Sequence, residues 1–231
     1  MRHVQKPIRY ALLALAAALL IYECWFLARI AWWIDHDPGS TRLMAQRTEE
    51  LRQRSPKTAL KHQWIAYERI SVHLKRAIIA AEDAKFVDHE GFDWDGIQRA
   101  MEKNQRKGKV VAGGSTITQQ LAKNLFPSSE RSLVRKGQEA FITAMLEALM
   151  SKRRILEIYL NVVEWGEGVF GAEAAARHYF GASAASLSPE QAARLAAMLP
   201  RPRFYERNRN SNYLAQYTQT ILVRMSAAQV P

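Results

Sequence analysis

The feature that most constrains this chain is an apolar stretch near its N-terminus, running from Tyr10 to Ile34. An α-helix over these residues rises about 37 Å at 1.5 Å per residue, enough to cross a bilayer with some tilt. Glu23 is costly deep in a membrane, whereas the tryptophans toward the far end suit the aromatic belt at an interface. The stretch therefore predicts an uncleaved transmembrane anchor over residues 10–34.

Two processed leaders and a soluble helix are the alternatives for this stretch. A cleaved signal peptide shares the basic start, but no convincing small-x-small cleavage site precedes the charged region. A lipoprotein signal needs a small residue before the cysteine, and Glu23 stands before Cys24. A soluble amphipathic helix keeps a polar face, whereas residues 10–22 are apolar all round. The basic N-terminus, residues 1–9, is expected to stay in the cytoplasm, so the remainder faces outward.

Length and charge bound the rest of the chain. The sequence has 231 residues and a net charge of +11, which implies an anionic partner such as nucleic acid, acidic phospholipid or a phosphorylated substrate. The single cysteine, Cys24, excludes an internal disulfide framework. Residues 35–60 are predicted to be a polar connector, and residues 61–231 one all-α domain of lysozyme size.

A carboxylate, an aromatic ring and an imidazole fall on one helical stripe just after the apolar run 77–81. Glu82, Phe86 and His89 follow one another at i, i+4 and i+7. Such a set is unusual in a core and suits a cleft, so Glu82 is the predicted chemical centre. Taken alone, the stripe also permits a hydrolase, a core histidine or a salt-bridged surface.

The segment 113–124 combines glycines, hydroxyls and amides. Ser115 or Thr116 can cap the following helix, and Thr116 begins a capping-box pattern, so a plain cap is one interpretation. The other is a binding face, because Thr116, Gln120 and Lys123 again stand at i, i+4 and i+7. A hydroxyl, an amide and an ammonium group beside a helix N-terminus suit a sugar phosphate.

A third polar cluster lies on a helix predicted from Arg131 to Met150. Arg135, Lys136 and Glu139 stand at i, i+1 and i+4. Taken alone, the cluster is an ordinary helical ion pair that contributes a few tenths of a kcal/mol.

Together these segments resemble one family. The order and spacing of four motifs agree with those of the peptidoglycan glycosyltransferases, glycosyltransferase family fifty-one, from about residue 60 to residue 205. The motifs are Glu82-Asp83-x-x-Phe86-x-x-His89-x-Gly91, Gly114-Ser-Thr-Ile-Thr-Gln-Gln120 with Lys123 and Asn124, Arg135-Lys136-x-x-Glu139, and Lys152-x-x-Ile155-Leu-Glu157-x-Tyr159-Leu-Asn161. The sequence contains neither the Ser-x-x-Lys nor the Lys-Thr-Gly motif of a transpeptidase, so it resembles the monofunctional members.

The resemblance implies a lysozyme-like helical fold and a reaction. In that reaction lipid II is polymerised into β-1,4-linked glycan strands with inversion, undecaprenyl diphosphate is released, and no transpeptidation occurs. Glu82 is then the base that accepts the proton of a sugar hydroxyl, and Glu139 is the second essential carboxylate. The residues expected to bind substrate are Asp83, Phe86, His89, Ser115, Thr116, Gln120, Lys123, Asn124, Arg135 and Lys136. Of these, His89 is also expected to support its loop and the glycine turn.

The same resemblance gives the expected partners and location. The partners are lipid II, the growing glycan chain and the membrane, but not nucleic acid; other cell-wall proteins are not identified by the sequence. A divalent cation, Mg²⁺ or Mn²⁺, is expected without a dedicated cage of protein ligands, and its ligands are not assigned. The location is the bacterial inner membrane, crossed once, with the N-terminus cytoplasmic and the domain periplasmic.

Two rival functions remain open from the sequence. A lysozyme-like hydrolase or lytic transglycosylase also uses a catalytic glutamate, but it has no diphosphate to bind and no use for Arg135 and Lys136. A membrane-tethered scaffold that grips nucleic acid or anionic lipid predicts basic residues interleaved with stacking aromatics. Here acids and amides recur on the basic stripes instead.

Overall fold

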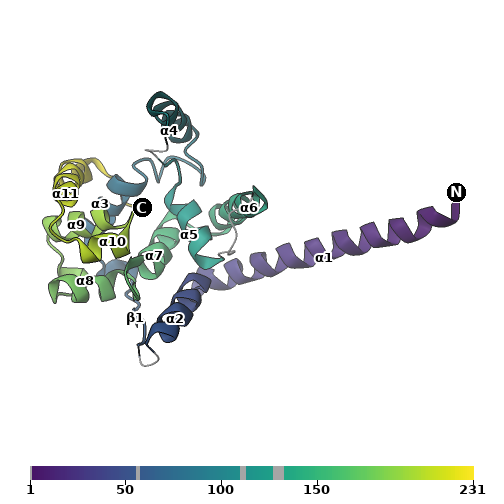
Figure 1. Ribbon diagram of the computed structural model, residues 1–231, viewed down its shortest axis with the longest axis horizontal. Helices are drawn as coiled ribbons and strands as arrows, with labels where there is room; N and C mark the ends of the chain where they lie inside the picture. The colour runs from purple at the N-terminus through teal and green to yellow at the C-terminus, as the bar shows by residue number, and fades with distance from the viewer. Residues whose placement is uncertain (1, 56–57, 110–112, 127–132) are drawn as a thin grey trace. The chain divides into compact units, whose positions relative to one another are not determined.

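The computed structural model describes residues 2–55, 58–109, 113–126 and 133–231, and it divides into two compact units, Met1–Asp37 and Pro38–Pro231. The first unit is one continuous helix, α1 (Arg2–Asp35), drawn in purple in Figure 1. Among the described residues, its segment Ile8–Asp35 is the one helix long and apolar enough to cross a membrane, judged by length and composition. A helix of this kind is compatible with the predicted anchor over residues 10–34.

The second unit is built mainly of helices, which confirms the predicted all-α class. Its α-helices are α2 (Arg42–Arg54), α3 (Val72–Glu82), α4 (Trp94–Lys107), α5 (Ile117–Leu125), α6 (Leu133–Leu149), α7 (Lys152–Val162), α8 (Ala172–Phe180), α9 (Pro189–Met198), α10 (Pro202–Arg207) and α11 (Asn212–Arg224). The described part of the chain also contains the short 3₁₀ helices η1 (Tyr67–Arg69), η2 (Ala184–Ser186) and η3 (Met225–Ala227). The predicted helix from Arg131 begins at Leu133 in the described chain, and residues 131 and 132 lie outside it.

A small sheet accompanies the helices and was not expected from the sequence. Strands β1 (Lys61–His62), β2 (Glu164–Gly166) and β3 (Val169–Phe170) pair in the order β1-β3-β2, with β1 parallel and β2 antiparallel to β3. The tight turn between β2 and β3 requires Gly168, whose φ of 71° suits glycine. The strands are only two or three residues long, so periodicity gave no signal for them.

The core of the second unit joins two groups of helices. In one group α3 packs against α9 and α11, and in the other α5 packs against α6 and α7 (Figure 1). Trp165, Tyr159, Phe86 and Phe170 are fully buried among them, and Trp165 donates a hydrogen bond from Nε1 to the carbonyl of Leu195 at 3.1 Å. These contacts fix the relative positions of the helix ends that carry the polar motifs.

The predicted connector folds as part of the second unit. Helix α2 begins after Thr41, whose side chain accepts a hydrogen bond from the Met44 amide, and it packs against α5. The compact unit begins at Pro38, whereas the sequence placed the start of the domain at residue 61. The difference arises because α2 is highly charged and carries few apolar residues, of which Met44 and Leu51 are buried.

Helix α3 ends earlier than the stripe of Glu82, Phe86 and His89 assumed. Its cap at Ser71 is confirmed, because the Ser71 hydroxyl accepts a hydrogen bond from the His73 amide. The helix stops at Glu82, and the following residues form turns, so the prediction of a continuous helical stripe was wrong. The cause is tertiary: Asp83 leaves the helix with φ −161° and its side chain binds α5 instead.

Candidate active site

A cavity of about 620 Å³ opens between α2, the end of α3, α5, α6, β2 and the turn that precedes α10. Eight of the predicted site residues line it: Glu82, Ser115, Gln120, Lys123, Asn124, Arg135, Lys136 and Glu139. The remaining four, Asp83, Phe86, His89 and Thr116, lie outside its lining. The structure therefore brings most of the charged, hydroxyl and amide side chains of the motifs together at the cavity. The other four predicted residues lie outside the cavity lining.

Glu82 is the last residue of α3 and its carboxyl group faces α5. Its Oε2 accepts a hydrogen bond from Nε2 of Gln120 at 2.7 Å, and Oε1 of Gln120 accepts one from the Tyr159 hydroxyl at 2.9 Å. Burial raises the pKa of Glu82 above its ordinary value of 4.5, and the nearby charge of Asp83 acts in the same direction, against the Gln120 bond. A raised pKa makes a carboxylate at a cleft wall a stronger base than an ordinary carboxylate, and so better suited to accept a proton.

The other residues of the first motif build the turn behind Glu82. Asp83 is buried, and its carboxylate accepts hydrogen bonds from the Ile117 amide at 3.0 Å and from Nε2 of His89 at 2.9 Å. Nδ1 of His89 accepts a bond from the Gly91 amide at 3.1 Å, which confirms that His89 supports its loop and the glycine turn. Phe86 is fully buried. None of these three side chains lines the cavity, and Asp83 and His89 fasten the turn that follows Glu82.

Ser115 and Thr116 have different roles, one at the cavity and the other at the start of α5. Thr116 is buried, caps α5 in a complete capping box with Gln119, and donates a hydrogen bond to the carbonyl of Gly91 at 2.7 Å. Ser115 lines the cavity. The capping interpretation of Thr116 is confirmed, and a hydroxyl for a ligand is left to Ser115.

The basic members of the site surround Glu139. This carboxylate is only 7% exposed, and it forms ion pairs with Arg135 one turn away and with Nζ of Lys136 at 3.4 Å. Lys136 and Lys123 are exposed to solvent at the cavity. Three positive charges lie in this part of the cavity, on Lys123, Arg135 and Lys136. They exceed the single negative charge of Glu139, so this part of the cavity suits a multiply charged anion.

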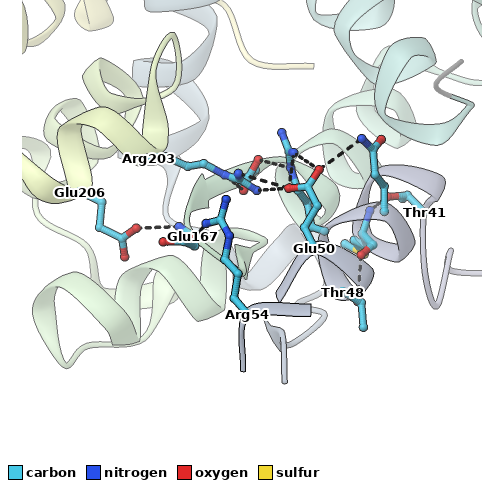
Figure 2. A network of polar contacts seen from close by, with 11 residues as sticks. Thr41, Thr48, Glu50, Arg54, Glu167, Arg203 and Glu206 are labelled. Atoms are coloured by element: carbon cyan, nitrogen blue, oxygen red, sulfur yellow. Dashed lines mark hydrogen bonds and ion pairs between the residues drawn. The ribbon is translucent and has the colours of Figure 1, made fainter. Parts of the chain in front are cut away.

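The sequence did not identify Arg47 and Glu164, which also line the cavity. Glu164 is 7% exposed and binds two arginines, accepting from Nε of Arg47 at 3.3 Å and from Nε of Arg203 at 2.7 Å. Both arginines also bind Glu50, with Arg47 at 2.7 Å and Arg203 at 3.4 Å. Figure 2 shows Glu50 of α2 facing Arg203 of α10.

This network, named here the α2 clamp, consists of Arg47, Glu50, Glu164 and Arg203. Beside it Arg54 binds Glu167 at 2.8 Å (Figure 2). Two positive and two negative charges balance, so the clamp holds α2 against β2 and α10 without adding net charge to the cavity. One sequence signal was available, since Arg47 and Glu50 stand at i and i+3 on a predicted helix.

Residues 47–226 match the family model described as Transglycosylase. A biosynthetic peptidoglycan transglycosylase of Dechloromonas aromatica is 62% identical over 231 residues, with all of both chains covered. One of Methylobacillus flagellatus is 60% identical over 223 residues, which cover 96% of this chain and 97% of that protein. One of Janthinobacterium sp. is 57% identical over the full length of both.

A helical domain whose cleft sets a half-buried carboxyl group beside clustered cations is, with these relatives, an enzyme of the glycosyltransferase class. The chain belongs to the transglycosylase family. The resemblance drawn from the four motifs is thereby confirmed over most of the chain.

Proposed function

We propose that this enzyme polymerises lipid II into β-1,4-linked peptidoglycan glycan strands with inversion and releases undecaprenyl diphosphate. The observation that supports this best is the pairing, in one cavity, of the half-buried Glu82 with the cations Lys123, Arg135 and Lys136. A glycosyl transfer from a diphosphate needs both a proton acceptor and a site for the anionic leaving group. The names of the relatives support peptidoglycan as the product.

In the proposed step, the acceptor sugar hydroxyl attacks the anomeric carbon of the donor. The bond from that carbon to the diphosphate oxygen breaks, and its electron pair leaves with the diphosphate. The hydroxyl proton passes to Glu82, whose raised pKa suits a base near neutral pH. Lys123, Arg135 and Lys136 stabilise the growing charge on the diphosphate, and a single displacement inverts the anomeric configuration.

Substrate binding and the absence of a second activity complete the proposal. Ser115, Gln120 and Asn124 offer one hydroxyl and two amides to sugar hydroxyls and phosphate oxygens along the cavity wall. Glu139 orients Arg135 and Lys136, with which it already forms ion pairs. Transpeptidase activity is not expected, because the sequence contains neither the Ser-x-x-Lys nor the Lys-Thr-Gly motif.

Turnover of lipid II by the wild type and by Glu82→Gln tests the proposal. The wild type is expected to form a glycan polymer and undecaprenyl diphosphate. Loss of a positioned general base costs about 10²–10⁴-fold in rate, so Glu82→Gln is expected to lose polymerisation while staying folded. Consumption of lipid II by Glu82→Gln at a near-normal rate would overturn the role of Glu82.

The rival function is that of a lysozyme-like hydrolase or lytic transglycosylase, because a carboxyl group with a raised pKa can also act as a general acid. Incubation of the wild type with purified glycan, without lipid II, separates the two functions. The proposed synthase leaves glycan uncut, whereas a hydrolase or lytic enzyme shortens it. The three cations at the cavity favour the synthase, since finished glycan offers them no diphosphate.

A divalent cation, Mg²⁺ or Mn²⁺, is also proposed to assist the reaction. Among the described residues, no group of three His, Cys, Asp or Glu side chains is placed to hold a metal ion. The carboxylate of Glu139 is already paired with Arg135 and Lys136. No step above passes through a metal ion.

The proposed location is the bacterial inner membrane, with the N-terminus in the cytoplasm and residues 38–231 in the periplasm. The apolar helix Ile8–Asp35 and the basic residues that precede it support this orientation. Protease added to spheroplasts is expected to degrade the second unit and to leave an N-terminal tag intact. Protection of the second unit would reverse the orientation.

A further inference from the structure

Tyr159 is a buried tyrosine that the proposed reaction does not use. It lies on α7, has no exposed surface, and its hydroxyl donates a hydrogen bond to Oε1 of Gln120 at 2.9 Å. Nε2 of the same amide donates to Oε2 of Glu82 at 2.7 Å. A directed chain of hydrogen bonds therefore runs from Tyr159 through Gln120 to Glu82.

The direction of this chain matters because an amide has two ends of similar shape and opposite function. With its NH₂ group toward Glu82, Gln120 stabilises the carboxylate. With its oxygen toward Glu82, it faces another acceptor unless Glu82 carries a proton. The Tyr159 hydroxyl selects the first orientation, since it already donates to the amide oxygen.

The Tyr159 hydroxyl is a dependable donor at neutral pH. Burial raises the pKa of Tyr159 well above its ordinary value of 10, and the negative charges of Glu82 and Asp83 act in the same direction. The hydroxyl therefore keeps its proton throughout the range in which the enzyme works. Hydrogen bonds in such a low-dielectric setting polarise one another, so loss of the first weakens the second.

We propose that Tyr159 is a positioning residue, whose hydroxyl locks the Gln120 amide so that its NH₂ group faces Glu82 and keeps that carboxylate ready to accept the proton of the acceptor sugar. This inference rests on the proposed role of Glu82 as the base. Tyr159 itself is not among the residues that line the cavity. Its effect is therefore expected on the rate and on its pH dependence rather than on substrate affinity.

Several charged and titratable groups lie around Glu82, and one of them provides a control variant for Tyr159→Phe. Asp83 follows it in the chain, Tyr159 approaches from α7, and Tyr217 approaches from α11 with its hydroxyl donating to the carbonyl of Ala81 at 3.3 Å. The other charged groups of the cavity are Arg47, Lys123, Arg135, Lys136, Glu139 and Glu164. Tyr217→Phe removes a tyrosine hydroxyl near Glu82 without touching Gln120, and so matches Tyr159→Phe.

The first experiment measures kcat/KM for lipid II against pH with the full chain in detergent. In Tyr159→Phe the Gln120 amide loses the hydrogen bond that fixes its orientation, so the acidic limb of the kcat/KM profile is expected to move to higher pH. The kcat at neutral pH is expected to fall about tenfold, the effect of one hydrogen bond. The KM is expected to change less than kcat. Tyr217→Phe is expected to keep the acidic limb of the wild type. Equal limbs in Tyr159→Phe and Tyr217→Phe would overturn the proposal.

A double-mutant cycle separates positioning from a general structural role. Gln120→Met removes the amide, so Tyr159→Phe is expected to change kcat less than twofold in that background. A full tenfold loss there would show that Tyr159 acts by another route, which overturns the proposal. If Tyr159→Phe does not fold, Gln120→Met tests the proposal alone. The acidic limb of its pH profile must then move to higher pH, and an unchanged limb would contradict the hydrogen-bond chain from Tyr159 through Gln120 to Glu82.

Failure of this inference can be told apart from failure of the proposed function. If Glu82→Gln still polymerises lipid II, the assignment of the base is at fault. If Glu82→Gln is inactive and Tyr159→Phe behaves like Tyr217→Phe, only the role of Tyr159 is lost.

Discussion

Glu82 and Asp83 are neighbours in the sequence, but their carboxylates lie in different environments. Glu82 lines the cavity and accepts a hydrogen bond from Gln120, whereas Asp83 is buried and accepts from the Ile117 amide and from His89. Helix α3 ends between them, and the change in backbone direction turns the two side chains apart. One carboxylate is therefore available for chemistry, and the other joins α3 to α5.

The difference in stability between Glu82→Gln and the wild type is expected to depend on pH. Burial raises the pKa of Glu82 above its ordinary 4.5, so the folded chain holds this proton more tightly than the unfolded chain. The resulting stability is complete below the unfolded pKa and is lost as the pH rises through the folded pKa. Glutamine does not titrate, so Glu82→Gln does not lose stability as the pH rises. Its Tm should therefore exceed that of the wild type at neutral pH and match it at about pH 4. Near-UV circular dichroism measures this, and a lower Tm at neutral pH would contradict it.

Asp83→Ala is expected to destabilise the second unit. The change leaves the buried Ile117 amide and the His89 ring without their acceptor, which costs about 1–3 kcal/mol. For a domain of this size the Tm should fall by several degrees. Asp88→Ala, at an exposed position of the same turn, is the control and should leave the Tm unchanged. Equal Tm values for the two variants would show that Asp83 does not fasten the turn.

Ser115 and Thr116 are expected to separate binding from stability. Thr116→Val removes the cap of α5, which costs about 0.5–2 kcal/mol, and should lower the Tm. Ser115→Ala should leave the Tm unchanged and raise the KM for lipid II, since Ser115 lines the cavity. Thermal unfolding and steady-state kinetics on both variants check this. The reverse pattern, with Ser115→Ala less stable and Thr116→Val weaker only in KM, would refute the division.

Opening the α2 clamp is expected to affect both stability and activity. Arg203→Gln removes the 2.7 Å bond to Glu164 and leaves that buried carboxylate with Arg47 alone. A hydrogen bond to a charged group contributes about 1.5–3 kcal/mol, so the Tm should fall by several degrees. The KM for lipid II should rise, because Arg47 and Glu164 line the cavity. Arg207→Gln, on the same helix but exposed, should change neither quantity, and an equal effect there would exclude a specific clamp.

Arg135→Ala tests the proposed site of the leaving group. Loss of a charge-assisted contact should weaken equilibrium binding of undecaprenyl diphosphate about tenfold to hundredfold, the equivalent of 1.4–2.8 kcal/mol. Arg52→Ala removes an exposed arginine of α2 that does not line the cavity, and serves as the charge control. The weaker binding should also show a smaller dependence on salt. Unchanged affinity in Arg135→Ala would place the diphosphate elsewhere.

Local signals predicted much of the site. The i, i+4 spacing of Arg135 and Glu139 is an ion pair in the structure, and the Thr116 pattern is a complete capping box. Such features depend on residues within one or two helical turns, so the sequence holds all the information that they need. The same reasoning failed just after Glu82, because the helix is ended by a long-range bond from Asp83 to α5.

The sequence by itself determined the apolar N-terminal helix, the all-α class, the family and most of the polar residues of the cavity. Capping and motif order are local properties, and folding leaves them unchanged. The tertiary structure decided which carboxylate faces the cavity, joined Tyr159 to Glu82 through Gln120, and brought Arg47 to Glu164 from 117 positions away. Those relationships come from the packing of helices far apart in the chain, and no local pattern encodes such packing.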